Sequence, residues 1–71
     1  MGIDQRKILG SSIRRLRDEQ GLTQEQLASM IGNGSKQYIS AIENGSKNVT
    51  IDVLCRIAEA FGIKVKDLID F

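Results

Sequence analysis

Apolar residues recur along this chain at intervals of three and four, the spacing that places side chains on one face of a helix. The pattern predicts five helices, separated by short stretches that contain glycine, serine or asparagine. We expect these helices at about 4–20, 23–31, 35–44, 51–61 and 64–71. The sequence therefore predicts an all-α fold, with residues 1–71 forming a single five-helix domain.

The segment 21–45 has the start and stop signals of two short helices that follow each other closely. Thr23 can accept from a backbone N–H at the start of the first, and Gln26 can reach back to the N–H of Thr23, which makes a capping box. Gly32-Asn33-Gly34 then stops the helix, and Ser35 is a new N-cap. Two helices with so short a connection pack across each other, so we expect a central helix-turn-helix.

The second helix of this pair has a narrow apolar stripe, Ile39 and Ile42, which leaves its other face available to a partner. That face carries small or polar residues, namely Lys36, Gln37, Ser40, Ala41 and Asn44. Lysine can donate to guanine, glutamine can bind adenine through two hydrogen bonds, and alanine can contact a thymine methyl group. The face is therefore a candidate reader of base edges in the DNA major groove. An ordinary solvated face is the alternative, because lysine, glutamine and serine are common on surfaces.

The remaining helices supply the core and the other caps. We expect Asp4 and Thr50 to cap the first and fourth helices, and Gly62 to end the fourth. Gly10, with the Ser11-Ser12 pair, predicts fraying of the first helix before Ser12. The expected core positions are Ile8 or Leu9, Ile13, Leu16, Val53 or Leu54, Ile57, Ala58 and Phe61. Val65, Leu68 and Ile69 have the three-to-four spacing of a short fifth helix.

Charge gives only a weak signal for nucleic acid, because 10 lysines and arginines stand against 9 acidic residues. The distribution is uneven, however. Residues 1–47 carry seven basic and five acidic groups, whereas residues 48–71 carry three and four. The small basic excess thus lies on the half that contains the helix-turn-helix.

The composition excludes most enzymatic chemistry. The chain has no histidine, no nucleophile beside an evident base and no glycine-rich loop after a strand, so we expect neither catalysis nor a metal or cofactor site. Its single cysteine, Cys55, rules out an internal disulfide and a zinc cluster, and its apolar neighbours predict a buried side chain. No leader pattern and no membrane-length apolar run is present, so we expect a cytoplasmic protein without a membrane or small-molecule partner.

Several motifs together resemble one family. They are IRRLR at 13–17, GLTQEQLA at 21–28, IS at 39–40, ENG at 43–45 and LCRIAEAFGI at 54–63. In this order and spacing, residues 13–68 resemble the phage-repressor helix-turn-helix family, the Cro/cI or xenobiotic-response-element type. The resemblance implies a lambda-repressor-like domain that regulates transcription, often as a repressor, and binds an inverted-repeat operator as a homodimer. The run 48–51 is similar to the small controller proteins of restriction–modification systems.

The resemblance also implies roles for individual residues. Lys36, Gln37 and Ala41 match base-reading positions, and Gln24 matches a glutamine that bonds a DNA phosphate; the further phosphate candidates are Ser35, Ser40, Asn44 and Lys47. Arg17 and Glu43 match a pair usually joined in a buried ion pair. The turn at 32–35 departs from the family because it is one residue longer and has no apolar residue, which affects the register of Lys36 and Gln37.

The sequence leaves the dimer contact and one alternative function open. Val65, Ile69 and Phe71 are candidates for a dimer contact built from this domain, or they complete the core of a monomer. The alternative to a regulator that binds double-stranded DNA is a protein-partner module, such as an antitoxin or an adaptor with the same fold. An acidic or apolar third helix would mark that class, and Lys36-Gln37 argues against it.

Overall fold

The structure of the protein, a computed structural model, describes residues 4–32 and 35–69. This part of the chain forms five α-helices and contains no strand: α1 Gln5–Glu19, α2 Gln24–Met30, α3 Lys36–Glu43, α4 Ile51–Phe61 and α5 Val65–Leu68. The all-α, five-helix prediction is confirmed. The turn residues Asn33 and Gly34 and the dimer candidate Phe71 lie outside the described residues.

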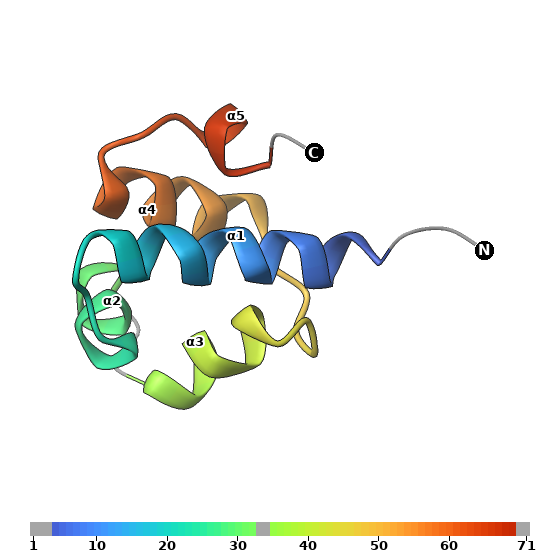
Figure 1. Ribbon diagram of the computed structural model, residues 1–71, viewed down its shortest axis with the longest axis horizontal. Helices are drawn as coiled ribbons and strands as arrows, with labels where there is room; N and C mark the ends of the chain where they lie inside the picture. The colour runs from blue at the N-terminus through green and yellow to red at the C-terminus, as the bar shows by residue number, and fades with distance from the viewer. Residues whose placement is uncertain (1–3, 33–34, 70–71) are drawn as a thin grey trace.

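The long helix α1 runs through the middle of the molecule, with α4 and α5 on one side of it and α2 and α3 on the other (Figure 1). α2 packs against α3 and α4, while α1 contacts both α3 and α5. The core between them consists of Ile13, Leu27, Ala28, Ile31, Ile39, Ile42, Ile57, Ala58, Phe61 and Leu68. This arrangement leaves one side of α3 facing away from the rest of the protein.

The predicted caps are present at the helix termini. Thr23 Oγ1 accepts from the backbone N–H of Gln26 at 3.0 Å, and Gln26 Oε1 accepts from the N–H of Thr23 at 2.8 Å, which completes the capping box of α2. Thr50 accepts from the N–H of Val53 at 3.2 Å and so starts α4 at Ile51. These local bonds fix where each helix begins, independently of the packing.

Gly10 has a different role from the predicted one. α1 is continuous from Gln5, so the expected fraying before Ser12 is not seen. Gly10 is buried, and a Cβ at its position would lie 2.4 Å from the carbonyl oxygen of Ile42 and 2.5 Å from that of Glu43. The glycine therefore lets the last turn of α3 pack directly on the backbone of α1, and this packing offsets its low helix propensity.

The prediction of a buried Cys55 is wrong, because its side chain is exposed on α4. The buried positions of α4 are Ile57, Ala58 and Phe61, with Leu54 half-buried one turn earlier. These residues follow the spacing i, i+3, i+4 and i+7, and Cys55 falls about 100° away from Leu54 around the helix. Apolar neighbours in sequence were therefore a poor guide to burial at this position.

We expect Gly10→Ala to lower the free energy of unfolding by about 1–3 kcal/mol, the usual cost of overpacking. Helix propensity alone would predict the opposite sign, because alanine is favoured over glycine by roughly 1 kcal/mol in a helix. Ser11→Ala, at the exposed neighbouring position, is the matched control and should change stability little. Urea denaturation of the three proteins measures the difference, and a stabilised Gly10→Ala variant would contradict the close packing of α1 on α3.

Candidate nucleic-acid interface

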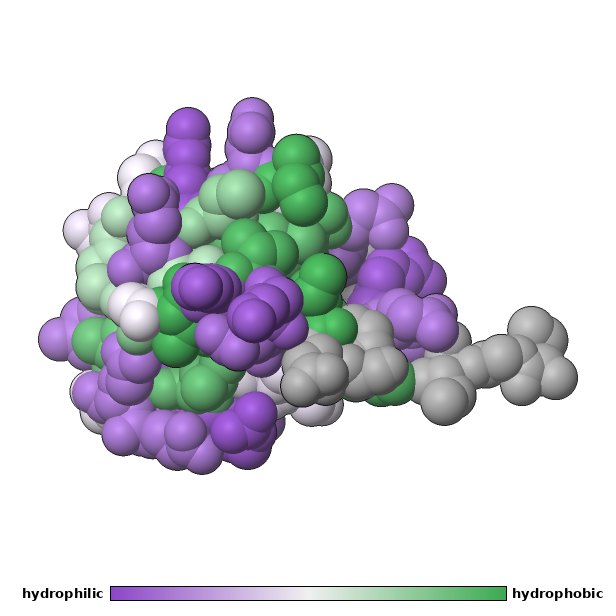
Figure 2. Space-filling model, turned by 90° about the horizontal axis from the view of Figure 1, so that it is seen from above, coloured by the Kyte–Doolittle hydropathy of each residue, from purple (hydrophilic) through white to green (hydrophobic). Residues whose placement is uncertain are grey.

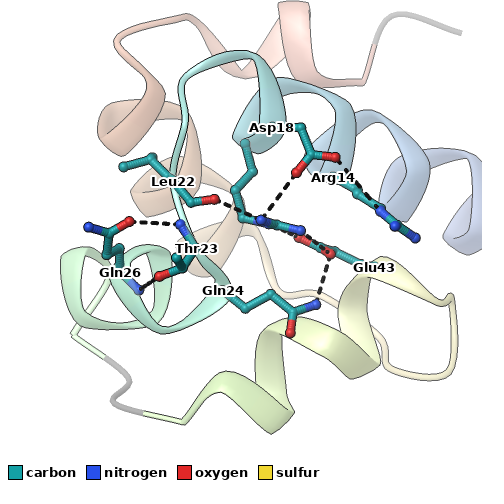
Figure 3. A network of polar contacts seen from close by, with 8 residues as sticks. Arg14, Asp18, Leu22, Thr23, Gln24, Gln26 and Glu43 are labelled. Atoms are coloured by element: carbon teal, nitrogen blue, oxygen red, sulfur yellow. Dashed lines mark hydrogen bonds and ion pairs between the residues drawn. The ribbon is translucent and has the colours of Figure 1, made fainter.

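A buried ion pair joins the end of α1 to the end of α3. Arg17 Nε donates to Glu43 Oε2 at 2.7 Å, and Arg17 Nη2 donates to Glu43 Oε1 at 3.1 Å, so the two groups share two hydrogen bonds (Figure 3). The Arg17 and Glu43 side chains are only 10% and 5% exposed. A bidentate pair of this kind fixes orientation as well as distance, so it holds the C-terminal end of α3 against α1.

Further donors and acceptors of this pair are also used. Arg17 Nη1 donates to the carbonyl oxygen of Leu22 at 2.7 Å and lies 3.3 Å from Asp18 Oδ1. Gln24 Nε2 donates to Glu43 Oε1 at 3.0 Å, which adds the first residue of α2 to the network. The hydrogen bond to Glu43 raises the pKa of Arg17; burial opposes this change, and the charges of Glu43 and Asp18 reinforce it. The guanidinium therefore remains charged.

This network borders a shallow hollow of about 370 Å³ between the start of α2 and the start of α3. The residues that line it are Arg17, Gly21, Leu22, Thr23, Gln24, Glu25 and Lys36. Gln24 uses one amide N–H on Glu43, which leaves its second N–H and its side-chain oxygen for another partner. Lys36 is exposed and brings a positive charge to the rim. The hollow therefore combines a neutral donor and a cation, which can bind an anionic group, with the carboxylate of Glu25 in the same lining.

The start of α3 orients a second glutamine. Ser35 caps the helix by accepting from the N–H of Tyr38 at 3.4 Å, and its hydroxyl donates to Gln37 Oε1 at 3.1 Å. Lys36 and Gln37 are exposed, whereas Ser40 and Ala41, one turn further on, are half-buried. The amide of Gln37 thus stands at the exposed N-terminal end of α3, and its two N–H donors take no part in the bond to Ser35.

The C-terminal end of α3 carries the other candidates. Asn44 Oδ1 accepts from the N–H of Ser46 at 2.9 Å, and both the N–H and the hydroxyl of Ser46 donate to the Ala41 carbonyl, at 3.0 and 3.2 Å. This turn leaves the amide N–H groups of Asn44, an exposed residue, available. Lys47 Nζ lies 5.9 Å from the centre of the Tyr38 ring, within the range of a cation–π contact.

The described parts of the chain, 4–32 and 35–69, contain no group of three or more His, Cys, Asp or Glu residues that could hold a metal ion. Within the same residues, no helix has the length and apolar character needed to cross a membrane.

Comparison with known proteins decides the family. The model of a family described as helix-turn-helix matches residues 13–68, which is most of the chain. The chain belongs to the Cro/cI-type helix-turn-helix family. It is 42% identical over 67 residues to an uncharacterized HTH-type transcriptional regulator of Sinorhizobium fredii, covering 94% of this chain and 86% of the relative.

Two further relatives are a control protein and a restriction–modification controller protein. The control protein C.BamHI of Bacillus amyloliquefaciens is 37% identical to this chain over 67 residues. The match covers 93% of this chain and 82% of C.BamHI. The crystal structure of the restriction–modification controller protein C.AhdI from Aeromonas hydrophila matches with a TM-score of 0.83 at 32% identity, over 87% of this chain and 88% of that one. Together with the family match, these relatives identify the Cro/cI-type chain as a DNA-binding transcriptional regulator rather than an enzyme.

Sequence reasoning missed three members of the polar network in this helix-turn-helix protein. The bond from Gln24 to Glu43 spans 19 positions, and Arg17 also uses the Leu22 carbonyl and Asp18. A backbone carbonyl has no signal in the sequence. Asp18 directly follows Arg17, but adjacent residues in a helix point in different directions, so only the structure reveals this contact.

We expect Glu43→Ala to cost about 3–5 kcal/mol of unfolding free energy, because it leaves the buried Arg17 charge without its partner. Chemical denaturation measures this cost. The double variant Arg17→Met with Glu43→Leu is the control, since it removes both charges and retains the apolar volume, and it should be less destabilised than Glu43→Ala. A loss below roughly 1 kcal/mol for Glu43→Ala would mean that the pair contributes no more than an exposed one.

Proposed function

We propose that this regulator reads a specific inverted-repeat operator as a homodimer, with α3 in the major groove of each half-site. The observation that carries the proposal is the exposed outer face of α3, on which Lys36, Gln37 and Asn44 retain hydrogen-bond donors. The opposite face of α3 is buried through Ile39 and Ile42, so the helix presents this donor-bearing face to any partner.

Each position on this face suits a distinct kind of contact. Lys36 and Gln37 stand in the first turn of α3, the part of a recognition helix that contacts base edges. Glutamine can bond the N6 and N7 atoms of adenine together, and lysine can donate to O6 or N7 of guanine. Ala41 follows one turn later, where a small side chain permits close approach to a thymine methyl group.

Phosphate contacts would set the register of the helix. Gln24, held by Glu43 at the start of α2, has amide groups left for a phosphate at the hollow beside α3. Ser40, Asn44 and Lys47 lie along or just beyond α3 and are further phosphate candidates, as is Ser35 at its N-cap. Contacts of this type orient the protein on the duplex but do not discriminate between sequences.

Dimerisation would use the face formed by α4 and α5. Figure 2, which looks onto this side of the molecule, shows hydrophobic residues gathered there among polar ones. Ile51 on α4 is 65% exposed and Ile69, at the end of α5, is 42% exposed, while Val65 is half-buried. For operator binding, the second copy must also bring the two α3 helices onto one duplex, with half-sites roughly 34 Å apart, about one helical turn.

The direct test is selection from a random pool of duplex DNA, followed by sequencing of the bound fraction at two salt concentrations. An enriched inverted repeat, with affinity that falls steeply as salt rises, supports a dimeric operator reader. Absence of any enriched sequence would overturn the proposal and favour the protein-partner module.

We expect Gln37→Ala to weaken binding to the selected operator and to relax one base position by about 1–3 kcal/mol, because it removes a base contact. Affinity for random duplex DNA should stay unchanged. Gln24→Ala should instead weaken binding to operator and random DNA by the same factor, since it removes a phosphate contact. Fluorescence titrations with both DNAs measure the two variants.

A stability control accompanies this comparison, because Gln24 also bonds Glu43 within the fold. Titrations are therefore made well below the melting temperature of both variants. Identical behaviour of the two variants on operator and random DNA would show that the roles of base reader and phosphate contact are wrongly assigned.

We expect Ile69→Asp to raise the dimer dissociation constant about tenfold or more, because burying a carboxylate in an apolar contact costs at least 1.4 kcal/mol. Met30→Asp is the matched control, since Met30 is 52% exposed but lies on α2. Sedimentation equilibrium gives both constants. Equal effects of the two substitutions would remove α5 from the dimer contact.

A further inference from the structure

The loop after α3 packs directly on the first turn of α1. Gly45 is buried with a φ of +81°, and a Cβ at its position would lie 2.6 Å from Lys7 Cγ and 3.1 Å from Lys7 Cα. Any larger residue would push the loop away from α1. Gly45 therefore brings the start of α1 to the C-terminal end of α3, although 38 positions separate Lys7 from Gly45 in the sequence.

This contact gathers basic side chains from two distant segments. Arg6 Nη1 donates to Asn48 Oδ1 at 3.5 Å, and Lys47 Nζ stands over the ring of Tyr38 on α3. Within residues 4–32 and 35–69, no carboxylate pairs with Lys7 or Lys47, and both are exposed. Asp4 is the acidic group of this region, 3.7 Å from Arg6 Nε, and both of these side chains are about half exposed. The local charge is therefore net positive.

We propose that Lys7, with Arg6 and Lys47, forms a second phosphate-binding patch for duplex DNA at the C-terminal end of α3. This inference rests on the proposed function, because it assumes that α3 enters the major groove. It adds residues from α1, which lie outside the helix-turn-helix itself, to the DNA-binding surface.

The dimensions of α3 support this assignment. An α-helix with its side chains is about 10–12 Å across, which fits the roughly 12 Å width of the major groove, and the eight residues of α3 separate its two ends by about 12 Å at 1.5 Å per residue. The hollow with Gln24 and Lys36 borders the N-terminal end of α3, and the patch borders its C-terminal end. A helix seated in the groove thus has a candidate phosphate-binding group at each of its two ends.

The chemistry of the patch fits phosphate better than a base edge. An exposed lysine is a compact cation on a flexible stem, with three donors and no acceptor. Such a group binds a phosphate as a point charge and carries little sequence information. The patch therefore contributes to affinity and to salt dependence, but not to the choice of operator.

The test measures the salt dependence of DNA binding by full-length wild-type protein, Lys7→Gln and Lys66→Gln. Glutamine keeps the Cγ atom that packs on Gly45, and Lys66 is an exposed lysine on α5 that provides a control with the same loss of charge. Fluorescence titrations use both the selected operator and a random duplex, at 50 and 200 mM salt. Circular dichroism melting confirms that each variant is folded.

For Lys7→Gln, the slope of log affinity against log salt should become shallower by about 0.9 per bound subunit, or about 1.8 for a bound dimer, so the affinity of the dimer falls about 12-fold less than that of the wild type over this salt range. The change should be equal on operator and random DNA, and Lys66→Gln should keep the wild-type slope. Equal slopes for Lys7→Gln and Lys66→Gln, with DNA binding intact, would overturn the proposed phosphate-binding patch and leave the proposed function standing. A wild-type protein that binds no duplex DNA overturns the proposed function and the patch together.

Discussion

The buried pair of Arg17 and Glu43 is the constraint on which the DNA-binding half of this molecule depends. Two charges taken out of water are costly unless every hydrogen-bonding group finds a partner. Here the guanidinium bonds Glu43 and the Leu22 carbonyl, and the carboxylate also accepts from Gln24. These partners come from α1, the following loop, α2 and α3. Any rotation of one helix would break several of the bonds at once, so the network constrains how α1, α2 and α3 pack against one another.

The pair can form only because α1 and α3 approach each other closely. Gly10, Ile13 and Arg17 are the buried residues of α1 and share one face at i, i+3 and i+7. Gly10 accommodates the backbone carbonyls at the end of α3, and Arg17, two turns further on, reaches Glu43. Gly45 allows a similar close contact in the loop after α3, where it packs on Lys7. Close backbone contact at two glycines thus sets the position of α3, and the ion pair sets its orientation.

The difference between local caps and contacts between distant elements explains what could be predicted from the sequence. The caps at Thr23, Ser35 and Thr50 each involve a residue three positions away, so local sequence was sufficient to place the starts of three helices. Cys55 and Gly10 were misjudged because their environment depends on which face of a helix meets another element. The outer face of α3 followed from its narrow apolar stripe, and residue roles on that face came from the family resemblance. The patch at Lys7 joins segments too distant for any sequence pattern to connect.

The near-neutral net charge of +1 is consistent with a DNA-binding surface once distance is considered. At physiological salt, charges separated by more than about 8 Å of solvent are largely screened, and the molecule measures 35 × 23 × 22 Å. The acidic residues of α4 and α5 are Asp52, Glu59 and Asp67, which lie on elements across α1 from α3 (Figure 1). Glu43 is neutralised by Arg17 inside the protein. A phosphate close to α3 therefore responds mainly to Lys36, Lys47 and Lys7, with Glu25 opposing Lys36 at the hollow, and the total charge of the chain says little about that local field.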